Sequence, residues 1–229
     1  MKVAIMQPYI FPYIGYFQLL KAVDTFVIYD DVNFKKQSWI NRNRILINDS
    51  DFMFNIILKG ASSSKKINEV EVVCNNHKLI ATIEHAYRKS PYFNEVYPLL
   101  TNTLLYKETN LAKYLTNTIK ATIAYLSINV SILISSEIEK NSLMKGEDKV
   151  IDICKQLKAT SYVNAIGGRE LYSREKFAEE GLILNFIKSK PIVYPQFINK
   201  FVPWLSIIDV MMFNSKKTIS EFLAQYEIL

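Results

Sequence analysis

The hydrophobic pattern of this chain alternates between short apolar runs and longer amphipathic segments. Apolar runs of strand length cover residues 3–6, 25–29, 130–134, 161–163 and 182–187. Between them, apolar residues recur with helical spacing over residues 17–23, 77–89, 111–126, 149–157 and 175–180. Strands that are separated by helices favour parallel pairing. We therefore predict an α/β fold with a Rossmann-like, mostly parallel sheet.

The middle of the chain departs from this alternation. Residues 44–47 and 52–58 are expected to form a strand pair across a turn at residues 48–50, and residues 67–74 also alternate like a strand. Residues 78–126 are largely helical in pattern, and the chain from Leu205 onward is predicted to be helical. We expect one α/β domain over residues 1–229, with a helical insertion at about residues 78–126.

The loop after the first predicted strand is the most distinctive segment. Residues 7–16 hold two prolines, one glycine, one glutamine and four aromatic rings. In a parallel sheet, this loop lies at the carboxyl end of a strand, where α/β folds bind ligands. The alternative is a rigid turn that packs over the sheet edge. We expect Gln7 to orient a substrate carbonyl or hydroxyl, with substrate-binding roles for Tyr9, Pro12, Tyr13, Gly15 and Tyr16.

Two adjacent carboxylates, Asp30 and Asp31, follow the second predicted strand. Neighbouring residues of a strand point to opposite faces, so both can serve one centre only if the chain turns there. We expect one of them to act as a catalytic base or a metal ligand and the other to cap the next segment.

Residues 39–44 combine a stacking ring with amides and guanidinium groups. Strand alternation would place Asn41 and Asn43 on one face, and Arg42 and Arg44 on the other. An arginine offers bidentate contacts to a phosphate or carboxylate, and Trp39 offers a stacking surface. The alternative is a solvated edge strand with ordinary salt bridges.

A second junction between a strand and a loop follows residues 161–163. Gly167 and Gly168 allow a close approach of the backbone to a ligand, although paired glycines also form ordinary turns. We include Asn164 and Arg169 with them as candidate substrate-binding residues.

Composition narrows the functional classes. The net charge of +6 comes mostly from scattered lysines, so nucleic-acid binding is not expected. Two cysteines are too few for a disulfide framework, and the only histidines, His77 and His85, resemble no zinc site, so we predict no resident metal. No export signal, membrane span, P-loop or dinucleotide-binding glycine motif is recognisable, and we expect a cytoplasmic protein.

Several motifs of the chain closely resemble the WbqC-like family. They are QPYIFPYIGYFQLL at residues 7–20, FVIYDDV at 26–32, WINRNRI at 39–45, Gly167-Gly168 with Leu171-Tyr172, and LSIID at 205–209 with Phe213-Asn214. Members of this family occur in bacterial gene clusters for O-antigen and related surface polysaccharides. The resemblance therefore implies a cytoplasmic role on activated sugars.

A more distant likeness links the N-terminal segment to cytidylyltransferases and pantothenate synthetases. Those enzymes carry His-x-Gly-His where this chain has Tyr13-Ile14-Gly15-Tyr16. Their histidines contact the nucleotide phosphates, whereas tyrosines donate hydrogen bonds without a positive charge near neutral pH. The likeness therefore implies the fold more than the adenylylation reaction.

Together, these observations predict a transferase of surface-polysaccharide biosynthesis. Its substrate would be a nucleotide-linked amino sugar, which receives an acyl or aminoacyl group from a second small-molecule donor. One alternative is a nucleotidyltransferase-like enzyme that uses ATP or CTP with magnesium. The other is a non-catalytic nucleotide-sugar binding or assembly factor. A homodimer is compatible with the size of the chain.

Overall fold

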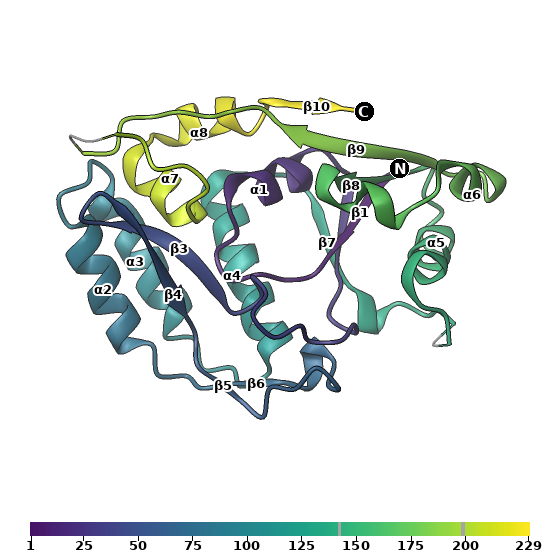
Figure 1. The fold of residues 1–229 in the computed structure, drawn as a ribbon, viewed down its shortest axis with the longest axis horizontal. Helices are drawn as coiled ribbons and strands as arrows, with labels where there is room; N and C mark the ends of the chain where they lie inside the picture. The colour runs from purple at the N-terminus through teal and green to yellow at the C-terminus, as the bar shows by residue number, and fades with distance from the viewer. Residues whose placement is uncertain (142, 198–199) are drawn as a thin grey trace.

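The computed structural model describes residues 1–141, 143–197 and 200–229, and its centre is a six-stranded sheet (Figure 1). The strands lie in the order β10-β9-β8-β1-β2-β7. Their bounds are β1 Lys2–Met6, β2 Thr25–Ile28, β7 Ser131–Ile134, β8 Ser161–Ala165, β9 Ile183–Ser189 and β10 Tyr226–Ile228. All neighbouring pairs are parallel except β9 with β10. When these six strands are numbered in chain order, their arrangement is the Rossmann order with an antiparallel last strand. This confirms the predicted fold class.

Helices cover both faces of the sheet. One core contains residues of α1, α4, α7 and α8, and the other contains residues of α5 and α6. The bounds are α1 Ile14–Lys21, α4 Leu111–Leu126, α5 Gly146–Gln156, α6 Arg174–Glu179, α7 Ile207–Phe213 and α8 Lys216–Phe222. The crossovers on the two sides of β1 therefore use opposite faces, as in other doubly wound sheets.

The central strands are apolar on both faces, which explains their uninterrupted hydrophobic runs. In β1, Ala4 packs into the first core, whereas Val3 and Ile5 pack into the second. In β2, Phe26 packs into the first core and Val27 packs into the second. Burial on both sides requires continuous apolar sequence rather than alternation with polar residues.

A long segment lies between β2 and β7 (Figure 1). Its elements before α4 are β3 Arg42–Ile47, β4 Ser50–Asn55, β5 Leu58–Lys59, a 3-10 helix at Ile67–Glu69, β6 Glu71–Val72, α2 His77–Tyr87 and α3 Phe93–Leu104. The strands β3 and β4 pair with each other outside the central sheet. The tight turn between them is made by Asn48 and Asp49, whose φ angles of 48° and 63° fit a type I′ hairpin.

Two predicted elements were wrong. Residues 67–74 form a 3-10 helix and the two-residue strand β6 instead of one strand. Ile67, Val70 and Val72 are buried, but Val73 is exposed, and beyond Val72 no described strand pairs with this segment. The C-terminal region is helical only through α8 and then ends in β10, which pairs with Ser189–Ile187 of β9. A three-residue strand is too short to show a period of its own, so only the neighbouring strand decides it.

Candidate functional site

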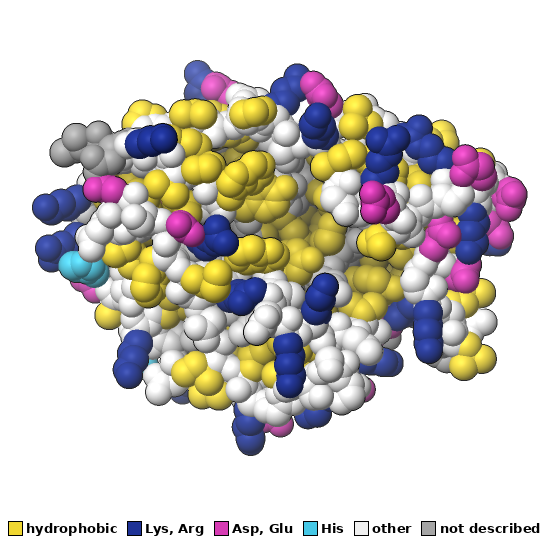
Figure 2. Space-filling view, viewed as in Figure 1, with side chains coloured by type: hydrophobic (Ala, Val, Ile, Leu, Met, Phe, Trp, Pro, Cys, Tyr) yellow, Lys and Arg dark blue, Asp and Glu magenta, His cyan; other side chains and the backbone are white. Residues whose placement is uncertain are grey.

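A cavity of about 660 Å³ opens at the carboxyl end of the sheet, between β1 and β8. From β1 the chain proceeds to β2 on one side, and it returns to β8 on the other, so the cavity lies at the topological switch point. Figure 2 shows apolar side chains gathered in a hollow near the centre of this face, with lysines and arginines around it. This is the place where doubly wound folds bind their ligands.

Most of the predicted substrate-binding residues, together with the predicted catalytic residue Gln7, line this one cavity. They are Gln7, Tyr9, Pro12, Tyr13, Gly15, Tyr16, Trp39, Asn43, Asn164, Gly167 and Gly168. Segments from the first and last thirds of the chain therefore meet at the site. The other predicted residues, Asp30, Asp31, Asn41, Arg42, Arg44 and Arg169, are not part of the lining.

Several lining residues were not among the predicted ones. Tyr29, Leu171, Tyr172 and Trp204 contribute side chains to the wall. Tyr29 directly precedes the two aspartates, and Leu171-Tyr172 belongs to a family motif, so both positions carried a signal. Trp204 carried none, because the surrounding apolar residues indicated a buried helix and nothing in the sequence marked it as exposed.

The side-chain amides of Gln7 and Asn164 are among the polar groups that line the cavity. Asn164 is buried at the end of β8, and its Oδ1 accepts a hydrogen bond from the N–H of Ala165 at 2.8 Å. A Cβ atom on Gly168 would lie 2.6 Å from Nδ2 of Asn164, so a larger residue there would displace this amide. Neither Nδ2 of Asn164 nor the side chain of Gln7 has a hydrogen-bond partner among the described protein groups.

Tyrosine hydroxyls supply the other polar groups of the cavity. Tyr16 donates a hydrogen bond to the carbonyl oxygen of Gln7 at 3.1 Å. Burial raises the pKa of Tyr9, Tyr16 and Tyr172 above the ordinary value, and burial together with Asp31 raises that of Tyr29. These phenols are therefore protonated near neutral pH and act as hydrogen-bond donors rather than bases.

The start of α1 forms part of the wall. No side chain caps this helix, and Tyr13 is its N-cap residue. A Cβ atom on Gly15 would lie 2.2 Å from the hydroxyl oxygen of Tyr13, so the tyrosine ring covers the position where a larger residue would have its side chain. The glycine thus leaves room for the Tyr13 ring to lie over the start of the helix.

A buried hydrogen-bond network, here called the joint, connects the walls of the cavity through Asn43 and Ser206. Asn43 of β3 donates from Nδ2 to the carbonyl oxygens of Ile10 and Phe11, at 3.1 and 2.7 Å. Ser206, just before α7, donates its hydroxyl to Phe11 at 2.7 Å and its backbone N–H to Arg44 at 2.9 Å. Asn43 and Ser206 are 5% and 0% exposed. The N-terminal loop, β3 and the chain before α7 are therefore fixed relative to one another.

Comparisons with known proteins show which family this chain belongs to. The model of the WbqC-like protein family matches residues 7–221. The chain belongs to the WbqC-like family. It is also similar to the uncharacterized protein Rv1507c of Mycobacterium tuberculosis (strain ATCC 25618 / H37Rv), with 28% identity over 97% of each chain. No solved structure gave a significant match. None of the helices described for this WbqC-like protein is long and apolar enough to cross a membrane.

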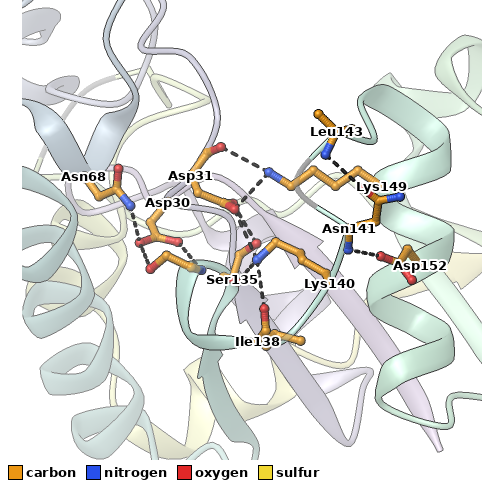
Figure 3. Close-up of polar contacts among 11 residues, drawn as sticks. Asp30, Asp31, Asn68, Ser135, Ile138, Lys140, Asn141, Leu143, Lys149 and Asp152 are labelled. Carbon is orange, nitrogen blue, oxygen red and sulfur yellow. Dashed lines mark hydrogen bonds and ion pairs between the residues drawn. The ribbon is translucent and has the colours of Figure 1, made fainter.

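Asp30 points away from the cavity of this WbqC-like protein. Its carboxylate accepts hydrogen bonds from the N–H and the hydroxyl of Ser136, at 2.9 and 2.6 Å, and from Asn68 at 3.1 Å (Figure 3). The side chain instead borders a second, more polar cavity of about 470 Å³ beside α4. The expectation that Asp30 and Gln7 act at one centre is not met by this geometry.

Asp31 turns the other way and forms a buried ion-pair cluster. Its carboxylate lies 2.9 Å from Nζ of Lys149 and 3.2 Å from Nζ of Lys140, and it accepts a hydrogen bond from Ser135 at 2.7 Å (Figure 3). Burial alone would raise the pKa of Asp31, but these hydrogen bonds and the charge of Lys149 hold it below the ordinary value. The two carboxylates diverge, as expected for adjacent residues at a strand end.

The arginines lie beside the cavity rather than in its wall. The guanidinium carbons of Arg42 and Arg44 lie 5.7 and 5.4 Å from the centre of the Trp39 ring. Arg42 also donates to the carbonyl oxygen of Gln37, and Arg44 forms an ion pair with Asp51 at 3.2 Å. Both arginines therefore share one face of the hairpin, as the strand alternation indicated.

Two further candidates lie outside the lining. Asn41 donates a hydrogen bond to the carbonyl oxygen of Ile56 at 3.2 Å, which ties the ends of the hairpin together. Arg169 is exposed on the 3-10 helix Ile166–Leu171 that follows β8. No charged side chain lines the main cavity among the residues that the structure describes. The described lining of this cavity is therefore neutral.

Proposed function

We propose that this WbqC-like protein binds a nucleotide-linked sugar in the main cavity, as part of bacterial surface-polysaccharide biosynthesis. The observation that carries the proposal is the position of an aromatic cavity at the topological switch point of a Rossmann-ordered sheet. The volume of about 660 Å³ falls in the range of small-molecule sites.

The lining suits the parts of such a ligand. The exposed rings at the mouth offer surfaces on which a nucleobase stacks, because every base has a π-face. The free amide groups of Gln7 and Asn164 donate and accept hydrogen bonds, as sugar hydroxyls require. The protonated tyrosine hydroxyls add further donors to the same interior.

The reaction that we propose is acyl or aminoacyl transfer to the amino group of the sugar. Asp30 and Asp31, which were expected to provide the base, lie outside the lining. In this proposal, the amine nitrogen bonds to the carbonyl carbon of a thioester donor, the bond from that carbon to sulfur breaks, and the thiolate takes the proton of the amine. The cavity then contributes orientation of the two substrates.

One observation favours a second candidate, which is binding without turnover. No charged side chain lines the cavity in the described parts of the chain, so no carboxylate or imidazole is placed to move a proton there. A protein that only holds or hands over a nucleotide-linked sugar needs no such group.

Isothermal titration calorimetry tests the binding proposal. We expect UDP-N-acetylglucosamine or UDP-glucosamine to bind the wild-type protein, and Gln7→Ala to weaken that binding by about 5- to 15-fold through the loss of one or two hydrogen bonds. The matched control is Gln156→Ala, which removes an exposed amide on α5. Failure of both compounds to bind, or equal affinity in Gln7→Ala, would contradict the proposal.

Mass spectrometry of the sugar separates the candidate activities. A mass gain after incubation with UDP-glucosamine and an acyl-coenzyme A supports group transfer. Tight binding without a mass change across acyl and aminoacyl donors supports the non-catalytic candidate. Release of pyrophosphate from ATP or CTP with magnesium would instead support nucleotidyl transfer.

A further inference from the structure

The only two tryptophans of the chain both lie at the mouth of the main cavity. Trp39 is 43% exposed, and Trp204 is 71% exposed. Large rings are usually more buried than this, and exposed rings gathered at the edge of a cavity mark a binding surface. The tryptophans reach this place from opposite ends of the sequence.

Trp204 has an unusual backbone conformation. Its φ angle of 62° lies in the left-handed region, which costs a non-glycine residue about 1–2 kcal/mol. The next residues, Leu205 and Ser206, are buried, and Ser206 is bonded to Phe11 and Arg44 in the joint described above. The anchored chain therefore holds Trp204 in a conformation that it would not adopt freely, and such residues cluster at ligand-binding sites.

The ring of Trp204 has a partner that leaves much of it exposed. Its centre lies 6.1 Å from that of the Tyr13 ring, with 57° between the ring planes. This tilted contact leaves most of the indole surface open to solvent. The exposed surface is wide enough for a nucleobase to stack.

The mouth and the interior of the cavity differ in charge. The described lining of the cavity is neutral, whereas Arg42 and Arg44 lie against the ring of Trp39 at the mouth. A diphosphate placed in the neutral interior would lose its hydration without a counter-charge. The same group near the two arginines remains hydrated and paired. The charged part of the ligand therefore belongs at the mouth.

We propose that Trp204 determines ligand specificity by stacking on the nucleobase at the mouth of the cavity, which rests on the proposed binding of a nucleotide-linked sugar. The diphosphate then lies near Trp39, Arg42 and Arg44, and the sugar extends inward to Gln7 and Asn164. The protein recognises the nucleotide by its flat ring and the sugar by its hydroxyl and amide groups.

Tryptophan fluorescence gives a direct test, because both tryptophans line the cavity. We would titrate UDP-N-acetylglucosamine, UDP and N-acetylglucosamine 1-phosphate into the wild-type protein and into Trp204→Leu, where Trp39 remains as the reporter. Base stacking is worth about 1–3 kcal/mol per base, so Trp204→Leu should weaken both uridine compounds by about 5- to 150-fold. The affinity for N-acetylglucosamine 1-phosphate should stay within about twofold, because this compound has no base.

Two variants separate stacking from general effects. Trp204→Phe keeps a flat ring and should restore most of the affinity for UDP. Phe52→Leu removes an exposed ring on β4, outside the cavity, and should change nothing. Since the Trp204 side chain is mostly exposed, thermal melts of all three variants should match the wild type.

The outcomes distinguish this inference from the proposed function. Wild-type affinity for UDP in Trp204→Leu, or an equal loss for the sugar phosphate, overturns the stacking role and leaves the proposed function standing. Failure of the wild-type protein to bind either uridine compound overturns the proposed function and the stacking role together.

Discussion

Two neighbouring regions at the carboxyl edge of the sheet use their conspicuous residues in opposite ways. After β2, Asp30 is buried and Asp31 is largely so, and their carboxylates are occupied by hydrogen bonds and ion pairs from Ser135, Ser136 and Lys149. Between β1 and β8, rings and amides surround an open cavity, and several polar groups there have no partner among the described residues.

The difference teaches how to interpret polar residues at a strand end. A buried carboxylate that already accepts several hydrogen bonds holds the chain together and has little capacity left for a ligand. An exposed ring or an amide without a hydrogen-bond partner in the protein is available for binding. The two aspartates therefore make their contacts with other parts of the protein, whereas neutral residues line the main cavity.

The largest expected effect comes from Asp31→Ala. Removal of this carboxylate leaves Lys140 and Lys149 buried without their counter-charge, so the free energy of unfolding should fall by about 3–5 kcal/mol. Urea denaturation measures this loss. Asp51→Ala removes the partner of Arg44 in a more exposed pair and should cost at most about 1 kcal/mol. A similar cost in both variants would contradict the structural role of Asp31.

Acid should remove part of the same stabilisation. The pKa of Asp31 in the folded protein lies below its ordinary value of 3.8, so its contribution is complete above pH 3.8 and is lost as the pH falls through the folded pKa. The difference in unfolding free energy between the wild type and Asp31→Asn should therefore shrink in urea titrations below pH 3.8. A constant difference from pH 7 down to pH 2 would show that the ion pairs do not depend on this charge.

A variant at the joint should affect both stability and binding. Asn43→Ala leaves the carbonyl oxygen of Ile10 without its side-chain donor and that of Phe11 with Ser206 alone, which should cost about 1–3 kcal/mol of unfolding free energy. The N-terminal loop is then less well fixed, so the affinity for UDP-N-acetylglucosamine should fall as well. In contrast, Asp31→Ala should leave the affinity of the folded fraction unchanged. Isothermal titration calorimetry, at a temperature where both variants are folded, compares their affinities for UDP-N-acetylglucosamine.

The smallest expected change in stability comes from Gly15→Ala. Alanine favours a helix over glycine by about 1 kcal/mol, but its Cβ must displace the ring of Tyr13. We expect the unfolding free energy to stay within about 1 kcal/mol of the wild type, while the affinity for UDP-N-acetylglucosamine changes at least severalfold. Unchanged affinity would show that the place of Tyr13 is unimportant for binding.

Much of the architecture was predictable because it depends on local patterns. The apolar runs of β1, β2, β8 and β9 and the helical spacing in α4 were recognised, because strands buried on both faces and amphipathic helices have distinct periods. Short elements whose conformation depends on contacts with other segments were missed. They include β10 and the 3-10 helix that begins at Ile67.

The candidate site was predictable to a similar degree. The loop of residues 7–16 and the junction at Asn164 were placed at one sheet edge, because the carboxyl ends of parallel strands meet there. Trp204 was missed because its exposure follows from a left-handed backbone conformation that is fixed by Ser206. The roles of Asp30 and Asp31 were uncertain because their partners, around residues 135–149, lie about a hundred residues away in the chain.

By itself, the sequence determined the α/β class, the strand that precedes each candidate loop, and membership of the WbqC-like family. Only the tertiary structure decided which polar groups are occupied by the protein itself and which remain free around the cavity. The physical reason is that hydrogen-bond and ion-pair partners are set by contacts between distant segments, whereas helices and strands follow from the local period of apolar residues.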